Sequence, residues 1–452
     1  MKNHISVKQG LDIRLYGEAN KIIQNETASS SYALVPDDFP GLTSKPVAQP
    51  GDTLKIGSLV FVDKYKPEIR FVSPVSGILK DIVRGEKRKI MKYLIIPDDT
   101  NDTEVFEKPD VNTLTREQSV SFLCNAGLWP FVTQRPYGVI ANPETTPKSI
   151  FISFYDTAPL APDYEFFLKD YLQQMIHGLK IIRPLTTGKI HLGFAKNSGL
   201  IQSFLGLDFV ETHTISGPHP AGNVGTIINK IDPINKGEIV FTLMPQDIVS
   251  IGNTALSGKY SPERIIAVTG SELTHTGYVK TRHGASIKSL LNGNVEHDPD
   301  AVRIVSGNVL TGTNVGYKGY LGYKHPQITA IPEGKKYVMF GWMKPGFKKF
   351  SNSHTYFSWL FPKRRYRIDT NLNGGLRNLV VTGEYEKVCP FDIYPQYLIK
   401  AIIAKDIDKM EQLGIYEVIE EDLALCEFVC TSKTQIQAIL REGLDLIRSE
   451  MN

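Results

Sequence analysis

The sequence lacks the features of several common classes of protein. Its 452 residues include only four cysteines, too few for a disulfide framework. No apolar stretch approaches the roughly 20 residues of a membrane-spanning helix, and no apolar stretch follows a basic start as in a signal peptide. The net charge is only +3, without the basic stripe that binds nucleic acid. These absences favour a reducing compartment and argue against an integral membrane, exported or nucleic-acid-binding protein.

The motifs of common redox cofactors are missing too. There is no G-x-G-x-x-G and no Walker loop to bring backbone amides to a phosphate. An iron–sulfur cluster needs about four thiolates, and the cysteines are widely scattered. Residues 247–250 begin like a covalent flavin motif, but Ile251 and Gly252 replace its Gly-Ala. We therefore expect no tightly bound cofactor, no covalent flavin, no metal and no catalytic residue in this chain, and Cys426 and Cys430 to be buried structural thiols.

A chain of this length must divide into domains, because single cores stop growing near about 250 to 300 residues. Short strands between Gly and Pro turns make residues 1–105 similar to a biotinyl/lipoyl-like β-barrel, the barrel-sandwich type, with its hairpin between segments 47–61 and 71–79. Lys64 stands near the place of a carrier domain's modified lysine. Phe61 and Val62 depart from a lipoyl site, however, so we expect Lys64 to be an exposed turn residue.

The rest of the chain predicts three further parts and a multi-domain α/β fold. Residues 106–258 alternate helical and β-rich stretches, which indicates a Rossmann-like α/β domain without a nucleotide motif. Its expected helices cover 115–126 and 163–179, and its expected strands 149–154, 181–182 and 190–194. Residues 259–375 predict a small ubiquitin-like β-grasp (SLBB-like) domain and an extension, and residues 376–452 predict a helical domain.

Several unusual segments point together to one family. They are residues 128–130, 135–136, 156–161, 217–222, 246–252, 304–310 and 420–426. On these segments the chain resembles the A subunits of the sodium-translocating NADH:quinone reductases (NQR), and the resemblance runs from Lys8 to the C-terminus. It implies a translocase complex that oxidises NADH, reduces ubiquinone or menaquinone and exports sodium ions.

The resemblance also implies how this chain takes part. FMN, FAD, 2Fe-2S and NADH are expected on partner subunits, so the isolated chain should show no activity. It should lie on the cytoplasmic side of the bacterial inner membrane, held there by subunits B to F and chiefly by the membrane-embedded B subunit. The family further places this chain at the quinone end of electron transfer.

A quinone ring needs an apolar slot with aromatic walls and one or two donors. Trp129, Phe131, Arg135 and Tyr137 supply that set on one turn-rich segment, and His219, between two prolines, suits a proton donor. The alternative is structural. Trp129 and Phe131 would then pack between barrel and sheet, Arg135 would form a salt bridge, and His219 a fixed hydrogen bond.

Three other possibilities remain open at this point. His213 and His219 with Glu211 suggest a metal, although loop histidines are far more often ordinary. The chain could be a purely structural scaffold of its complex with no ligand. It could also be a flavin-dependent component similar to the C subunit of the related ferredoxin-oxidising pump, but only Cys389-Pro390 remains of that protein's cysteine motif, and the bulky segment 128–131 would obstruct a flavin loop.

Overall fold

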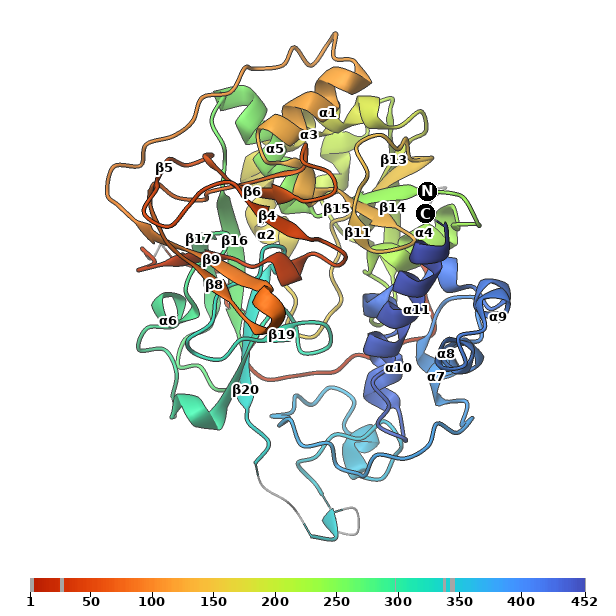
Figure 1. The fold of residues 1–452 in the computed structure, drawn as a ribbon. Helices are drawn as coiled ribbons and strands as arrows, with labels where there is room; N and C mark the ends of the chain where they lie inside the picture. Colours follow the sequence, from red (N-terminus) through yellow and green to blue (C-terminus); the bar gives the residue numbers. More distant parts are fainter. Residues whose placement is uncertain (1–3, 25–27, 297, 336–338, 342–345, 452) are drawn as a thin grey trace.

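Three groups of strands and a set of C-terminal helices build the structure (Figure 1). The computed structural model describes residues 4–24, 28–296, 298–335, 339–341 and 346–451. In Figure 1 the N-terminal barrel lies on one side of the α/β sheet and the C-terminal helices, in blue, lie on another. The expected multi-domain α/β organisation is confirmed.

Two small sheets form the N-terminal barrel. One contains β3 (Tyr32–Leu34), β5 (Thr53–Leu54), β8 (Gly77–Arg84) and β9 (Ile90–Pro97), and the other β4 (Ser44–Pro46), β6 (Leu59–Asp63) and β7 (Arg70–Val72). Phe61 stacks on Phe71 and Tyr93, with ring centroids 4.3 and 4.5 Å away. The turn between β6 and β7 leaves Lys64 exposed, as predicted.

The second body is a seven-stranded sheet in the order β1-β14-β13-β12-β15-β10-β11. Its strands are β1 (His4–Ser6), β10 (Thr133–Arg135), β11 (Val139–Ile140), β12 (Ser149–Ser153), β13 (Ile190–Ala195), β14 (Val210–Ser216) and β15 (Val240–Leu243). The first five strands in this order pair in parallel. β10 runs antiparallel to β15, and β11 runs antiparallel to β10.

Helices cover both faces of this sheet. α1 (Arg116–Asn125), α3 (Leu172–Ile182) and α5 (Pro245–Ser257) share the large core, whereas α4 (Val224–Ile231) packs on the opposite face. The predicted strand at 181–182 is wrong, because both isoleucines end α3. The end of α3 contacts α1, where Ser119 Oγ donates to Ile181 O at 2.6 Å. This contact joins residues far apart in the chain, so the local sequence pattern does not report it.

The third body, called here the third sheet, has six strands in the order β19-β18-β20-β16-β17-β2. They are β2 (Ile23–Gln24), β16 (Glu263–Thr269), β17 (Gly277–Arg282), β18 (Val302–Ser306), β19 (Thr313–Asn314) and β20 (Gln327–Pro332), with α6 (Ile287–Leu290) after β17. β1 and β2 thus join other sheets and lie outside the barrel expected over 1–105. Such short strands carry no sequence pattern that specifies a partner strand more than 200 residues away.

The C-terminal helices have a core of their own and are called here the helical region. They are α7 (Glu384–Val388), α8 (Pro395–Ile403), α9 (Ile407–Gln412), α10 (Ala424–Val429) and α11 (Ile436–Met451). Across the part of the chain that the structure describes, no helix combines the length and apolar character needed to cross a membrane.

Two glycines bring α3 and α5 close together. A Cβ atom on Gly178 would lie 2.2 Å from the backbone oxygen of Ile248, and one on Gly252 would lie 1.9 Å from that of Gln174. A backbone atom at that distance cannot rotate away as a side chain can. The helices can therefore pack in this way only with glycine at these two positions.

We predict that Gly252→Ala destabilises the protein, although alanine favours a helix by about 1 kcal/mol over glycine. The contact with the Gln174 backbone should outweigh that gain and leave a net loss of about 1–3 kcal/mol. Thermal unfolding followed by circular dichroism measures the effect. Gly206→Ala is the control, because its Cβ would meet nothing within 4 Å. An unchanged unfolding midpoint for Gly252→Ala would contradict the close helix packing.

Candidate functional site

The segment that the sequence assigns to quinone contact lies in the protein interior. Trp129 and Phe131 belong to a short 3-10 turn after α1, and both side chains are 0% exposed. Trp129 donates its Nε1–H to Ala141 O at 2.8 Å and meets the Phe241 ring edge-on at 6.3 Å between centroids. A Cβ on the nearby Gly127 would lie 2.6 Å from the barrel residue Val72. The segment therefore packs between barrel and sheet.

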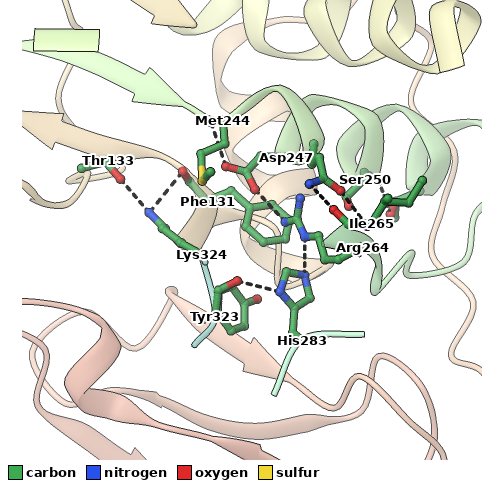
Figure 2. A network of polar contacts seen from close by, with 12 residues as sticks. Phe131, Thr133, Met244, Asp247, Ser250, Arg264, Ile265, His283, Tyr323 and Lys324 are labelled. Carbon is green, nitrogen blue, oxygen red and sulfur yellow. Dashed lines mark hydrogen bonds and ion pairs between the residues drawn. The ribbon is translucent and has the colours of Figure 1, made fainter. Parts of the chain in front are cut away.

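Phe131 lies at the centre of a buried polar network between the α/β domain and the third sheet (Figure 2). The Arg264 guanidinium lies 4.8 Å from the centre of its ring. The rings of His283 and Tyr323 lie 5.5 and 5.7 Å away and stack on each other at 4.4 Å. Aromatic and cationic groups therefore surround Phe131 and fill the space around it.

The polar contacts of this network fix its protonation. Arg264 donates from Nη2 to Asp247 Oδ1 at 2.6 Å and from Nε to His283 Nε2 at 3.1 Å. Because arginine can only donate, His283 Nε2 accepts, and Nδ1 carries the hydrogen that goes to Tyr323 O at 2.8 Å. Burial, and then the nearby Arg264 charge, hold the pKa of His283 well below its usual value. The imidazole is thus neutral and Arg264 is paired with Asp247.

Sequence elements explain why these residues meet. Asp247 lies in the first turn of α5, where it also accepts from Met244 N at 2.9 Å, a favourable place for a carboxylate. Arg264 is the second residue of β16. Lys324 closes the network by donating from Nζ to Thr133 Oγ1 at 2.6 Å, and burial lowers its pKa to about 8. At that pKa the Lys324 amine stays mostly protonated at neutral pH, so it acts as a donor in this network.

Asp38 connects the barrel to the polar network around Phe131. Its Oδ2 accepts a hydrogen bond from Tyr323 N at 2.8 Å. Burial raises the pKa of Asp38 to about 6, against the effect of that hydrogen bond. The folded protein therefore holds a proton on Asp38 more tightly than the unfolded chain does.

We predict that stability contributed by Asp38 falls as the pH rises from about 4 to about 6. In that range the folded state binds more protons than the unfolded state, so raising the pH favours unfolding. Asp38→Asn cannot ionise and should remove this part of the pH dependence. Urea midpoints of both proteins at pH 4, 5, 6 and 7 test it. Parallel pH profiles for the two proteins would show that Asp38 does not titrate in this way.

Arg135 joins the α/β sheet to the helical region. It is fully buried at the end of β10 and donates from Nη1 to Asp422 and from Nη2 to Glu421, each at 2.5 Å. The half-buried Tyr137 packs against the core of the helical region, and its backbone oxygen accepts from Arg441 Nη2 at 2.6 Å. These contacts match the structural salt bridge considered from the sequence.

We predict that Arg135→Ala loosens the helical region. The substitution leaves the buried Asp422 without its cation, which typically costs about 3–5 kcal/mol. Hydrogen exchange of α10 and α11, measured by mass spectrometry, should become faster. The control Lys387→Ala removes an exposed pair with Glu384 and should cost less than about 1 kcal/mol. Equal exchange in the two variants would mean that Arg135 does not hold the helices.

His219 lies apart from the other candidates. Its Nδ1 forms a hydrogen bond with Thr157 Oγ1 at 3.1 Å, and its backbone N–H donates to Asp12 Oδ1 at 3.0 Å. Burial lowers its pKa to about 4, so the ring is neutral. The structure brings Trp129 and Phe131 into one core. It directs Arg135 and Tyr137 toward the helical region and the His219 ring toward Thr157.

Three hollows on the described part of the surface are lined by residues other than these candidates. One of about 570 Å³ lies beside the barrel, and one of about 620 Å³ lies between the N-terminal segment and the third sheet. A third, called here the groove, measures about 500 Å³ and lies along α8 and α9. It is lined by Tyr394, Tyr397, Lys400, Ala401, Ala404, Asp406, Lys409, Gln412 and Leu413. The sequence alone did not indicate it, because Tyr394 is the N-cap residue before α8 and only Tyr397 lies within the helix.

The fold defines a multi-domain α/β protein with an N-terminal barrel-sandwich body, an α/β second domain, an SLBB-type sheet and C-terminal helices. Family models match it in that order: the NqrA N-terminal barrel-sandwich hybrid domain at residues 5–98, the NqrA second alpha/beta domain at 114–260 and the NQRA C-terminal (SLBB) domain at 265–316. The chain belongs to the NqrA family, the A subunits of the Na(+)-translocating NADH-quinone reductases. The predicted family is therefore confirmed.

Relatives support this assignment along the whole chain. The NqrA protein of Yersinia pestis bv. Antiqua is 34% identical over 449 residues, covering 99% of this chain and 100% of that protein. The one from Rhodopirellula baltica is 35% identical over 451 residues and covers 98% of each. Among solved structures, an air-oxidized NAD+-reducing [NiFe]-hydrogenase is 11% identical with a TM-score of 0.38, over 76% of this chain and 62% of that one.

Proposed function

We propose that this chain works at the quinone end of its complex and binds the quinone itself, without a flavin or iron–sulfur centre of its own. As part of a Na+-translocating NADH-quinone reductase, it contributes to a reaction that ends on a quinone. Ubiquinone and menaquinone are both candidates. Some part of the complex must present an apolar, aromatic surface to the quinone ring, and this chain has one.

The groove is the observation that carries this proposal. Tyr394 and Tyr397 are 65% and 50% exposed, and their rings meet edge-on at 6.3 Å between centroids. Ala401, Ala404 and Leu413 add apolar walls. The tyrosine hydroxyls and the exposed Lys400 amine can donate to the two carbonyl oxygens of a quinone.

Trp129, Phe131, Arg135 and Tyr137 remain a second proposed location for the quinone, and His219, which lies apart from them, remains a separate candidate for contact with it. Trp129 and Phe131 are enclosed, and Arg135 is held by the carboxylates of 421–422. A quinone could reach this set only if the helical region moved away from β10. The same burial favours a second candidate function, that of a purely structural scaffold with no ligand.

We propose that the chain has no flavin or iron–sulfur centre because side chains fill the segment where a flavin loop would lie, and because its thiols are buried. At segment 126–131, where the related ferredoxin pump would carry a flavin loop, Leu128, Trp129 and Phe131 are packed without exposure. All four thiols are free and buried, and Tyr385 donates its hydroxyl hydrogen to Cys430 Sγ at 2.9 Å. We assign FMN, FAD, 2Fe-2S and NADH to partner subunits.

We further propose that subunits B to F, chiefly the membrane-embedded B subunit, hold this chain on the cytoplasmic side of the inner membrane. The support is an exposed apolar segment at Phe357, Trp359, Leu360 and Phe361, followed by the basic residues 363–365. Exposed apolar clusters with a polar rim are typical of protein or membrane contacts.

We predict that the isolated chain binds ubiquinone-1 saturably and that Tyr397→Ala raises the Kd about tenfold, because an aromatic wall contributes up to about 1.5 kcal/mol beyond its buried area. Calorimetric titration measures both values. The control Tyr65→Ala removes a tyrosine of the barrel that is even more exposed, and this variant should bind like the wild type.

The outcomes separate the proposed roles. An unchanged Kd for Tyr397→Ala, together with weaker binding by Tyr137→Ala, would move the site to the second location. Heat changes that never saturate in the wild type would favour the scaffold. A stoichiometric flavin spectrum in the chain expressed alone would overturn the assignment of cofactors to partner subunits.

A further inference from the structure

Two histidines and a glutamate from adjacent strands converge at one end of the α/β sheet. His191 is the second residue of β13 and pairs in parallel register with Glu211 of β14. His213 follows two residues later on β14. Because side chains alternate along a strand, Glu211 and His213 share the face that carries His191.

The atoms of the three side chains that can bind a metal lie close together. His191 Nδ1 and His213 Nε2 are 3.0 Å apart, and His191 Nδ1 lies 3.7 Å from Glu211 Oε2. One such atom from each residue lies within 4.8 Å of the other two. In a tetrahedral zinc site with bonds of 2.0–2.1 Å, neighbouring ligand atoms lie about 3.3 Å apart. The two histidine nitrogens are already close to that spacing, and the Glu211 carboxylate would have to move toward them to complete the geometry.

The surrounding packing holds the two rings in place. The His191 ring stacks on Phe151 of β12 at 4.5 Å between centroids, and both histidines are buried. Glu211 is partly exposed, so an ion can enter from solvent on its side. Two imidazoles and one carboxylate on a rigid sheet are a ligand set that zinc uses, with a fourth position for water.

Both imidazoles of the cluster are neutral and can therefore act as ligands. Burial lowers the pKa of His191 to about 4 and also lowers that of His213, so both rings are neutral and have a lone pair to offer. Without an ion, one of the two facing nitrogens must carry the hydrogen between them. With an ion, both lone pairs point at it and the hydrogens lie on the outer nitrogens. The charges of Glu211 and Asp232 favour positive charge at His191, and that of Lys189 opposes it.

We propose that His191, Glu211 and His213 bind one divalent transition-metal ion of the zinc type. His191 and Glu211 lie near the amino ends of their strands and His213 lies in the middle of β14, whereas ligands of open α/β sheets bind at the carboxyl ends. The ion therefore has a structural role, fixing β13 to β14. Sequence alone suggested His219 as the partner of His213, but His219 faces Thr157 and His191 takes its place.

The test is a zinc titration of the full-length, tag-free chain against a chromophoric chelator. We expect one tightly bound ion per chain, and an affinity at least about tenfold lower in His191→Ala and His213→Ala, since even residues outside the ligand set change metal affinity by that factor. His4→Ala is the control, because it removes an exposed histidine of the neighbouring strand β1. It should bind zinc like the wild type.

A second measurement keeps the result independent of folding. Circular dichroism checks that each variant is folded, and zinc should raise the thermal midpoint of the wild type and His4→Ala but not of the two cluster variants. Cobalt(II) should give the intense visible bands of a tetrahedral site in the wild type. Zinc binding that is not saturable in the wild type, or that is equally tight in folded His213→Ala, would overturn the proposal.

Discussion

The arrangement of the domains depends on a buried ion pair, Arg264 with Asp247. The two residues belong to different bodies, one to β16 of the third sheet and the other to the first turn of α5. Both are almost completely buried, so neither can find water if the other is removed. A buried pair adds little net stability compared with apolar packing, but breaking it is costly. The pair therefore fixes how the third sheet is oriented on the α/β domain.

A second buried ion pair lies where the helical region meets the α/β sheet. Arg135 faces the carboxylates of 421–422, and its Nε and Asp422 Oδ1 have no hydrogen-bond partner within the protein. A buried group with unused bonding capacity makes the junction less stable than an apolar one of the same size. The helical region has a core of its own, so this junction is where it can separate from the sheet with the least loss of packing.

Local sequence predicted the elements well and their partners poorly. The helix over 115–126, the strand over 149–154 and the strand at 190–194 appear as α1, β12 and β13. Periodicity reports such segments because one face of each is buried. It could not tell that residues 181–182 continue a helix, nor which sheet edges receive β1 and β2. Those outcomes depend on contacts between residues far apart in the chain.

The candidate site shows the same limit. Trp129, Phe131 and Arg135 were recognised as unusual residues, but whether an aromatic ring faces a ligand or a core depends on what the fold places above it. Here Arg264, His283 and Tyr323 cover Phe131, and none of them is near it in sequence. The meeting of His191 with His213 likewise required the strand order β14-β13-β12, which a single sequence does not contain.

Packing at the domain junctions has a consequence for where this chain can interact. Within the described residues, most exposed aromatic side chains lie between positions 340 and 397, including those of the groove and of the segment 357–361. Exposed aromatic clusters are unfavourable in an isolated protein and are typical of surfaces that bind something. Apart from a few residues such as the exposed Tyr65, the N-terminal barrel and the α/β domain bury their aromatic residues in mutual packing. The proposed contacts with quinone and with neighbouring subunits are therefore best sought on the last quarter of the chain, which Arg135 joins to the α/β sheet.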